Sequence, residues 1–213
     1  MQKESALLEV LLLFLATVLL ASNAAALTVG VKAGDWIEYQ VAIIGNIPEE
    51  HNATWAKIEV TQVQGTVINL TVTTTFEHAS PLVESVVLNL DAGILGDCFI
   101  IPANLGVGDS FFDSRQGNLT ITSATQKTVA GAARTLISAA TTETAYFWDQ
   151  NTGVLVEAHT VTSDFNMTTK ATKTNMWQDQ TAQVVLYVAA FAVVALLVAV
   201  ALFVFRKKKL ASQ

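Results

Sequence analysis

Hydrophobic and polar residues alternate with a period of two over most of the chain between residues 27 and 174. Such alternation is typical of strands that bury one face, and the frequent Val, Ile, Thr, Phe, Tyr and Trp support the same assignment. No apolar stripe with helical spacing extends beyond two turns in this part of the sequence. The pattern therefore predicts an all-β domain whose antiparallel strands form a curved sheet, a half-barrel or a sandwich.

Turn-forming residues divide this region into separate strands. The clearest strand covers 66–76, because Ile68, Leu70 and Val72 fall on one face while Asn69 and Thr71 fall on the other. We expect eight to ten strands, drawn from residues 36–44, 54–63, 66–76, 82–90, 94–101, 111–112, 119–124, 128–140, 146–148, 154–157 and 158–168. Gly131 is expected at a bulge or turn inside the range 128–140.

The hairpin near the end of this region has the strongest turn chemistry. The sequence Asp-Gln-Asn-Thr-Gly separates the apolar runs 146–148 and 154–157. Asp149 can accept hydrogen bonds from its own turn, and Gly153 can adopt the positive φ that closes the turn.

A different pattern, continuous rather than alternating, covers residues 184–205. These 22 residues contain no charge and no amide, and at about 1.5 Å per residue they span the ~30 Å hydrocarbon core of a bilayer. The alternative, a buried helix of a soluble domain, would show a polar stripe over six turns. Four cations follow, namely Arg206, Lys207, Lys208 and Lys209. They predict a stop-transfer sequence and a cytoplasmic basic tail over 206–213.

The N-terminus carries a shorter apolar run, Ala6 to Ala21, followed by small residues through Ala26. This arrangement predicts a signal peptide over 1–26 with cleavage after Ala26. Glu4 and Glu9 weaken this prediction, because a carboxylate in or beside the apolar run opposes insertion. The alternative is an uncleaved N-terminal anchor, which the short length of the run argues against. The expected organisation is a type I single-pass membrane protein: signal peptide, extracellular β-rich domain over 27–168, juxtamembrane stalk over 169–183, and the membrane helix.

Charge and cysteine content narrow the function classes. The chain has 12 basic and 18 acidic residues, and four of its cations lie in the tail, so the exported domain is clearly acidic. An acidic surface without a basic stripe excludes nucleic acid as a partner. The single cysteine, Cys98, cannot form an internal disulfide and is expected to be buried.

No motif in the sequence indicates catalysis or a cofactor. His51, His78 and His159 lack metal-ligand spacing, and neither a nucleophile elbow nor a glycine-rich phosphate loop occurs. We therefore expect no enzymatic activity, no cofactor and no metal site. Trp36, Trp55 and Trp148 are expected as core anchors of strands, and Trp177 at the level of the lipid headgroups.

Four sequons make Asn52, Asn69, Asn118 and Asn166 candidates for N-glycosylation. Three of them lie on the polar faces of expected strands, and Asn52 lies in a loop. The alternative is that they are ordinary polar residues of an exposed strand face.

Three stretches carry a family resemblance: GDWIEYQV, FIIPANLGVGDSF and YFWDQNTGVLVE. Together with the Arg/Lys-terminated span, they make the chain resemble uncharacterised archaeal membrane-anchored surface proteins. In strand pattern that group is similar to the half-barrel of LolA-type lipoprotein carriers. The resemblance implies a β-rich fold and brings no functional residues with it.

The expected function is that of a membrane-anchored cell-surface protein, a glycoprotein if the sequons are used, with a non-catalytic binding or structural domain. Its expected partners are the membrane and an extracellular protein, glycan or lipid. A lipid or hydrophobic-ligand module is the alternative, and it requires a concave apolar sheet face that no helix or plug fills. An envelope enzyme is the third reading, and it would need acidic residues clustered in a cleft.

Overall fold

The computed structural model describes residues 27–47 and 52–177. The expected signal peptide with Ala26, the expected membrane helix over 184–205 and the stop-transfer cations Arg206 to Lys209 lie outside the described residues. Within the described ranges no helix is long and apolar enough to cross a membrane.

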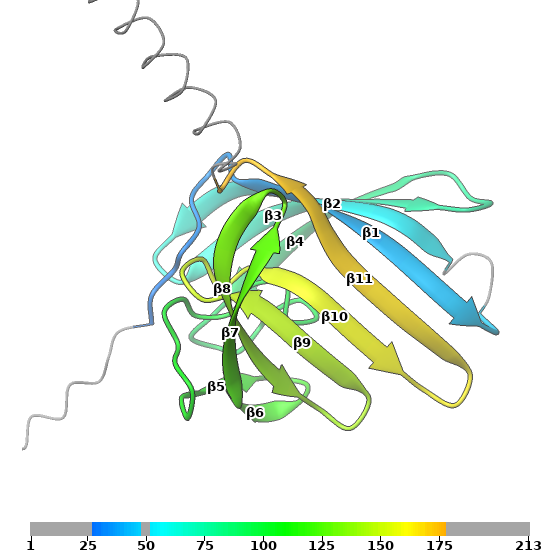
Figure 1. Cartoon of the computed structure of the whole chain (residues 1–213). Helices are drawn as coiled ribbons and strands as arrows, with labels where there is room; N and C mark the ends of the chain where they lie inside the picture. The colour runs from blue at the N-terminus through cyan, green and yellow to red at the C-terminus, as the bar shows by residue number, and fades with distance from the viewer. Residues whose placement is uncertain (1–26, 48–51, 178–213) are drawn as a thin grey trace, which may run out of the picture.

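Antiparallel strands make up the whole of the regular structure in the described residues, which confirms the all-β part of the expected fold class (Figure 1). Nine strands form one curved sheet in the order β4-β3-β2-β1-β11-β10-β9-β8-β7, and two more form a separate ribbon, β5-β6. The strands are β1 (Trp36–Gly45), β2 (Ala53–Gln64), β3 (Val67–Phe76), β4 (Leu82–Asn89), β5 (Ser110–Asp113), β6 (Gly117–Thr120), β7 (Ser123–Val129), β8 (Ala132–Ala140), β9 (Thr144–Asp149), β10 (Leu155–Val161) and β11 (Phe165–Thr174).

The first and last strands of the domain pair with each other in the middle of the sheet. β1 and β11 run antiparallel from Ile37 opposite Thr174 to Gly45 opposite Phe165. Asn175 secures the start of this pair, because its side-chain oxygen accepts from the Trp36 N–H and its amide donates to the Gly34 carbonyl, both at 2.8 Å. The two ends of the domain are thereby held together.

Alternation of buried and exposed positions follows the sequence pattern along the sheet. On β3, Ile68 and Leu70 are at most 1% exposed, while Asn69 between them lies on the other face. Tyr39 on β1 is equally buried, and its hydroxyl donates to the Leu155 carbonyl at 2.7 Å. The apolar faces of the central strands therefore share one core on the concave side of the sheet.

Residues 90–109, the plug segment, fill part of that concave side. A strand was expected over 94–101, and this expectation is wrong: the segment makes turns, with single bridges at Ile94 and Ile100. The reason is local, since Gly96, Asp97 and Cys98 all have positive φ and cannot continue a strand. Its apolar residues still enter the core, because Leu95, Ile100 and Ile101 are at most 2% exposed.

The plug segment is tied to the β9–β10 hairpin by main-chain bonds. Ile101 N–H donates to the Gly153 carbonyl at 3.0 Å, and Leu155 N–H donates to the Phe99 carbonyl at 2.9 Å. Gly153 has φ of 69°, and a Cβ on it would lie 2.1 Å from the Ile101 carbonyl oxygen. This turn therefore requires glycine both for its backbone conformation and for the close approach of the plug segment.

Three other expected boundaries differ from the structure. The expected strand 119–124 is divided, because β6 ends at Thr120 and β7 begins at Ser123. Gly131 does form a turn, and this turn separates β7 from β8 within the expected range 128–140. The expected strand 158–168 is interrupted after Val161 by a tight turn, and β11 then continues to Thr174, so residues 169–174 belong to the sheet rather than to a stalk.

The hairpin of β7 and β8 connects to distant parts of the sheet. Lys127 on β7 forms an ion pair with Glu157 on β10, although β8 and β9 separate these strands in the sheet order. Arg134 on β8 lies over the Trp177 ring, 5.3 Å from its centroid. Trp177 is 7% exposed, so it belongs to the core and does not project freely as an indole at the headgroup level would.

Candidate functional site

An open groove occupies the part of the concave face that the plug segment leaves free. Its volume is about 340 Å³. Seven elements contribute to its wall: β1, β2, β3, β9, β10, β11 and the plug segment. The lining residues are Tyr39, Val41, Ala53, Ala56, Ile58, Val72, Thr74, Asp97, Phe99, Thr144, Tyr146, Leu155, Ala158, Thr160, Met167 and Thr169.

Strand register explains why these residues meet. Tyr146, Ala158, Thr169 and Val41 form one row across four neighbouring strands, each opposite the next. Residues directly opposite in an antiparallel pair point to the same face, so the whole row lines the groove. Alanine at two of the central lining positions, Ala56 and Ala158, leaves open space where larger side chains would meet.

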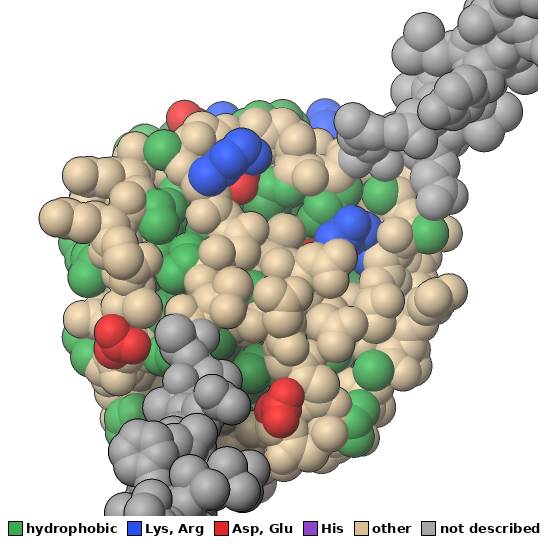
Figure 2. Space-filling model, turned by 90° about the vertical axis from the view of Figure 1, so that its left-hand side faces the viewer, with side chains coloured by type: hydrophobic (Ala, Val, Ile, Leu, Met, Phe, Trp, Pro, Cys, Tyr) green, Lys and Arg blue, Asp and Glu red, His purple; other side chains and the backbone are tan. Residues whose placement is uncertain are grey.

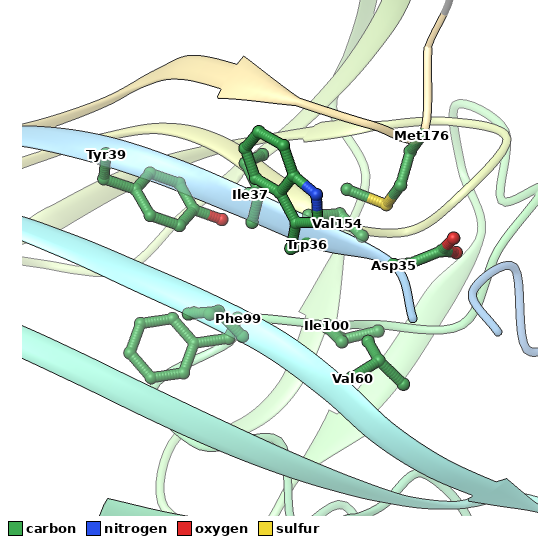
Figure 3. Close-up of a pocket in the computed structure, with 10 residues that line it drawn as sticks. Asp35, Trp36, Ile37, Tyr39, Val60, Phe99, Ile100, Val154 and Met176 are labelled. Carbon is green, nitrogen blue, oxygen red and sulfur yellow. The ribbon is translucent and has the colours of Figure 1, made fainter. Parts of the chain in front are cut away.

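The plug segment closes one end of the groove. Phe99 lines the groove, and Phe99 and Ile100 together with Val154 and Tyr39 surround a residual space of about 10 Å³ at the start of β1 (Figure 3). Such a space is about large enough for one water molecule and too small for a ligand. The closed end therefore defines the depth of the groove.

The opposite end is open and more polar. A hollow of about 380 Å³ adjoins the groove at Thr144 and Tyr146 and is otherwise lined by polar residues of the β8–β9 turn and Gln116. Gln116 donates to the Tyr146 hydroxyl at 3.0 Å. Thr144 and Thr160 hydroxyls are 3.0 Å apart, so hydroxyl groups mark the mouth of the groove.

Charge is nearly absent from the groove. Asp97 is the single charged residue among the described lining residues, and its carboxylate pairs with Arg115. Burial raises the pKa of Tyr39 and of Tyr146, so both phenols stay neutral over the physiological range. The groove is therefore an apolar, uncharged space with hydroxyl groups at its mouth.

Cys98 lies beneath the groove, in the plug segment, and is fully buried as expected. Its Sγ is 3.7 Å from Asp113 Oδ2, and the Trp148 indole N–H donates to its carbonyl at 2.7 Å. Burial, followed by the Asp113 carboxylate, raises the pKa of the Cys98 thiol to about 12. The thiol is therefore held in its protonated, unreactive form.

We expect Cys98 to resist a thiol reagent such as Ellman's reagent at pH 8 until the domain is unfolded. An unfolded thiol titrates near pH 8.5 while the folded one keeps its proton to about pH 12. Because the unfolded state then binds fewer protons, stability should fall as the pH rises above about 8.5. Urea denaturation at several alkaline pH values measures this, and Cys98→Ala should make the slope shallower. Reaction of the native thiol at the rate of free cysteine would contradict the assignment.

The sequon asparagines and the histidines are the other candidate residues from the sequence. Asn69, Asn118 and Asn166 lie on β3, β6 and β11 and point away from the core, and Asn52 directly precedes β2. His159 pairs with Glu157 at 2.9 Å and His78 lies 3.9 Å from Glu77, while His51 is outside the described residues. Within the described ranges no three His, Cys, Asp or Glu residues are grouped so as to hold a metal ion.

Only 14% of the residues of the chain are charged, so acidic and basic side chains are sparse. Figure 2 shows one face on which a few of them are scattered among polar and hydrophobic side chains. That face carries no continuous basic stripe, in keeping with the net charge of −6.

No family model and no curated protein matches the chain. Among solved structures, the chain is similar to the siderocalin Ex-FABP, which is described as functioning through dual ligand specificities. The two share 11% sequence identity, the match covers 72% of this chain and 80% of that one, and the TM-score is 0.27. A superposition at this level says nothing about function, so the groove itself has to indicate what the domain does.

Proposed function

We propose that the chain is an exported, membrane-anchored protein whose β-domain binds an uncharged hydrophobic ligand in the groove. The observation that carries this proposal is the open apolar groove of about 340 Å³, which the plug segment leaves unfilled. Its volume lies within the range of about 300–1,000 Å³ that is typical of small-molecule sites. This was the second of the three functions that the sequence left open.

The charge of the lining supports an uncharged ligand. A fatty acid or a phospholipid headgroup would enter the groove with a negative charge, and no Lys, Arg or His of the described lining could pair with it. Burying an unpaired charge is costly. A neutral chain with a hydroxyl end fits better, because Thr144 and Thr160 offer hydrogen bonds at the mouth.

The membrane anchor in this proposal is inferred from the sequence alone. Residues 184–205 are long and apolar enough to span a bilayer and are followed by four cations. An anchored domain of this kind would hold or receive its ligand at the cell surface. A purely structural role for the domain does not require an open groove, and we therefore favour ligand binding.

Filling the groove should abolish binding. We expect a shortened chain of residues 27–177 to bind N-phenyl-1-naphthylamine, an uncharged apolar fluorophore, with a rise in fluorescence. Ala56→Phe and Ala158→Phe should weaken this binding about tenfold or more, equivalent to about 1.4 kcal/mol or more. Ala133→Phe, at an exposed position of β8, is the matched control and should leave binding unchanged.

Competition tests the charge preference. Lauryl alcohol should displace the fluorophore at lower concentration than lauric acid of the same chain length. Undiminished binding by both groove-filling variants would refute the site, and better displacement by the acid would refute the proposed ligand class.

A further inference from the structure

The sequon asparagines lie beside exposed hydrophobic side chains. Among the described residues, Phe112 is 52% exposed and is the cross-strand partner of Asn118 in the β5–β6 ribbon. Val87 on β4 is 57% exposed and is the partner of Asn69.

Asn166 shows the same arrangement twice. On one side it is opposite Ile44 of β1, which is 75% exposed, and on the other it is opposite Val161 of β10, which is 61% exposed. The three residues thus form one row across β1, β11 and β10. Three sequons therefore account for four of the large hydrophobic side chains that the described surface exposes.

The geometry places each asparagine amide and its hydrophobic neighbour on one face. Directly opposed residues of an antiparallel pair have Cβ atoms about 4.5–5.5 Å apart. Asn118 and Asn166 are exposed, and Asn69 is half-buried with its amide donating to the Gln62 side chain at 3.1 Å. An amide nitrogen has two hydrogens, so Asn69 can keep this bond after one of them is replaced.

Asn52 differs from the other three and serves as an internal comparison. Its amide donates to the Glu77 carboxylate at 2.6 Å. The nearest strand pair is Ala53 opposite Phe76, and neither of these is a large exposed hydrophobic residue. No apolar patch of the described surface is associated with this sequon.

We propose that Asn69, Asn118 and Asn166 carry N-linked glycans that cover these four hydrophobic side chains. The apolar C–H face of the first sugar would pack on the neighbouring side chain and remove it from water, as burial of apolar surface favours. The polar remainder of the glycan faces solvent. This inference rests on the export included in the proposed function and is independent of ligand binding.

The attachment step needs a lipid-linked sugar donor. The amide Nδ2 attacks the anomeric carbon of a polyprenyl-phosphate-linked or polyprenyl-pyrophosphate-linked sugar, so that an N–C bond forms and the C–O bond to phosphate breaks. The lipid phosphate leaves, and one amide proton is lost to solvent. No atom changes its oxidation state in this step. The threonine that completes each sequon lies two residues after its asparagine.

A glycan also fits these positions better than a protein partner does. The four hydrophobic residues lie at three separate places on the domain rather than in one patch, whereas a protein interface requires a continuous surface. Val87 belongs to β4, an edge strand, where an uncovered apolar side chain favours edge-to-edge association. A bulky polar group at Asn69 would oppose such association.

Site-resolved mass spectrometry tests the proposal directly. The full chain would be exported by an archaeal strain that glycosylates a reporter sequon in the same preparation. We expect hexose-containing mass on at least two of Asn69, Asn118 and Asn166. Modification of fewer than two of them while the reporter is modified, or of Asn52 alone, would overturn the proposal.

A double-mutant comparison tests the covering role. Asn118→Gln should lower the melting temperature of the glycosylated protein by about 2–4 °C, and Asn52→Gln should not lower it. In a Phe112→Ser background, Asn118→Gln should have no such effect, because no apolar ring remains to be covered. An equal decrease in both backgrounds would overturn the proposed contact. Fluorophore binding by residues 27–177 tests the groove separately, since the groove lies on the opposite face of β3 and β11 from Asn69 and Asn166.

Discussion

Replacement of Trp148 by alanine should lower the free energy of unfolding by about 3–5 kcal/mol, the usual cost of removing a buried tryptophan. The side chain is completely buried on β9. It stacks on Tyr146 at 5.3 Å between ring centroids and meets Phe111 of β5 edge-on at 5.5 Å. Its indole N–H also donates to the Cys98 carbonyl at 2.7 Å, so one residue connects the sheet, the β5–β6 ribbon and the plug segment.

Two further variants separate these contributions. Trp148→Phe keeps an aromatic ring but leaves the Cys98 carbonyl without its donor, and it should cost less than the alanine variant. Trp55→Ala, at a half-buried position of β2, should cost less than either. Urea denaturation followed by circular dichroism measures all three. A Trp148→Ala protein as stable as Trp55→Ala would show that the plug segment is not held through this residue.

Asp149→Ala should destabilise the domain by about 3–5 kcal/mol, because it removes one partner of a buried ion pair. Asp149 is 1% exposed, and its carboxylate accepts hydrogen bonds from Arg134 Nε at 2.7 Å and from Nη2 at 2.9 Å. The same carboxylate accepts from the Thr152 N–H at 2.9 Å and hydroxyl at 2.7 Å. Alanine would leave the guanidinium and both Thr152 donors without these partners.

The control for this variant is Asp164→Ala, which removes an exposed carboxylate from the β10–β11 turn and should change stability by less than about 0.5 kcal/mol. Thermal or urea unfolding compares the two. If Asp149→Ala lowers the free energy of unfolding by less than about 1 kcal/mol, then water hydrates the Arg134 guanidinium in place of the carboxylate, and the hairpin turn does not depend on Asp149.

Most of the strand positions could be predicted from the sequence because one face of each strand is buried. Ile68 and Leu70 alternate with Asn69 and Thr71, and the structure confirms the strand that this alternation predicts. The turn from Asp149 to Gly153 was also predicted correctly, since its side-chain acceptor and its positive-φ residue are only four positions apart in the chain. Local rules of this kind require no knowledge of distant partners.

The plug segment could not be predicted in the same way. Its apolar run from Phe99 to Ile101 reads as a buried strand, because periodicity alone does not distinguish a strand from a packed irregular segment. The left-handed conformations at Asp97 and Cys98 depend on tertiary contacts, among them the bond between Trp148 and the Cys98 carbonyl. Trp177 was misplaced for a similar reason, since Arg134, its packing partner, is remote in sequence.

The groove depends on register rather than on any motif. Ala158, Thr169 and Val41 lie in one row because β10, β11 and β1 are neighbours, and the alternating pattern is compatible with many other strand orders. A signal was present in hindsight: Ala56 and Ala158 are small residues on faces otherwise occupied by larger ones. A sequence read alone offers no means of deciding whether such positions are packed tightly or left open.

The pairing of β1 with β11 affects how the domain folds during synthesis. The bonds that secure the start of this pair join residues as far apart as Trp36 and Asn175, 139 positions along the chain. Closing so long a loop costs conformational entropy before the hydrogen bonds between the strands can compensate for it. Topologies of this kind therefore fold slowly. During synthesis β2, β3 and β4 can assemble early, yet β1 keeps one edge unpaired until β11 is available. The incomplete sheet is therefore open to aggregation until almost the whole domain has been synthesised.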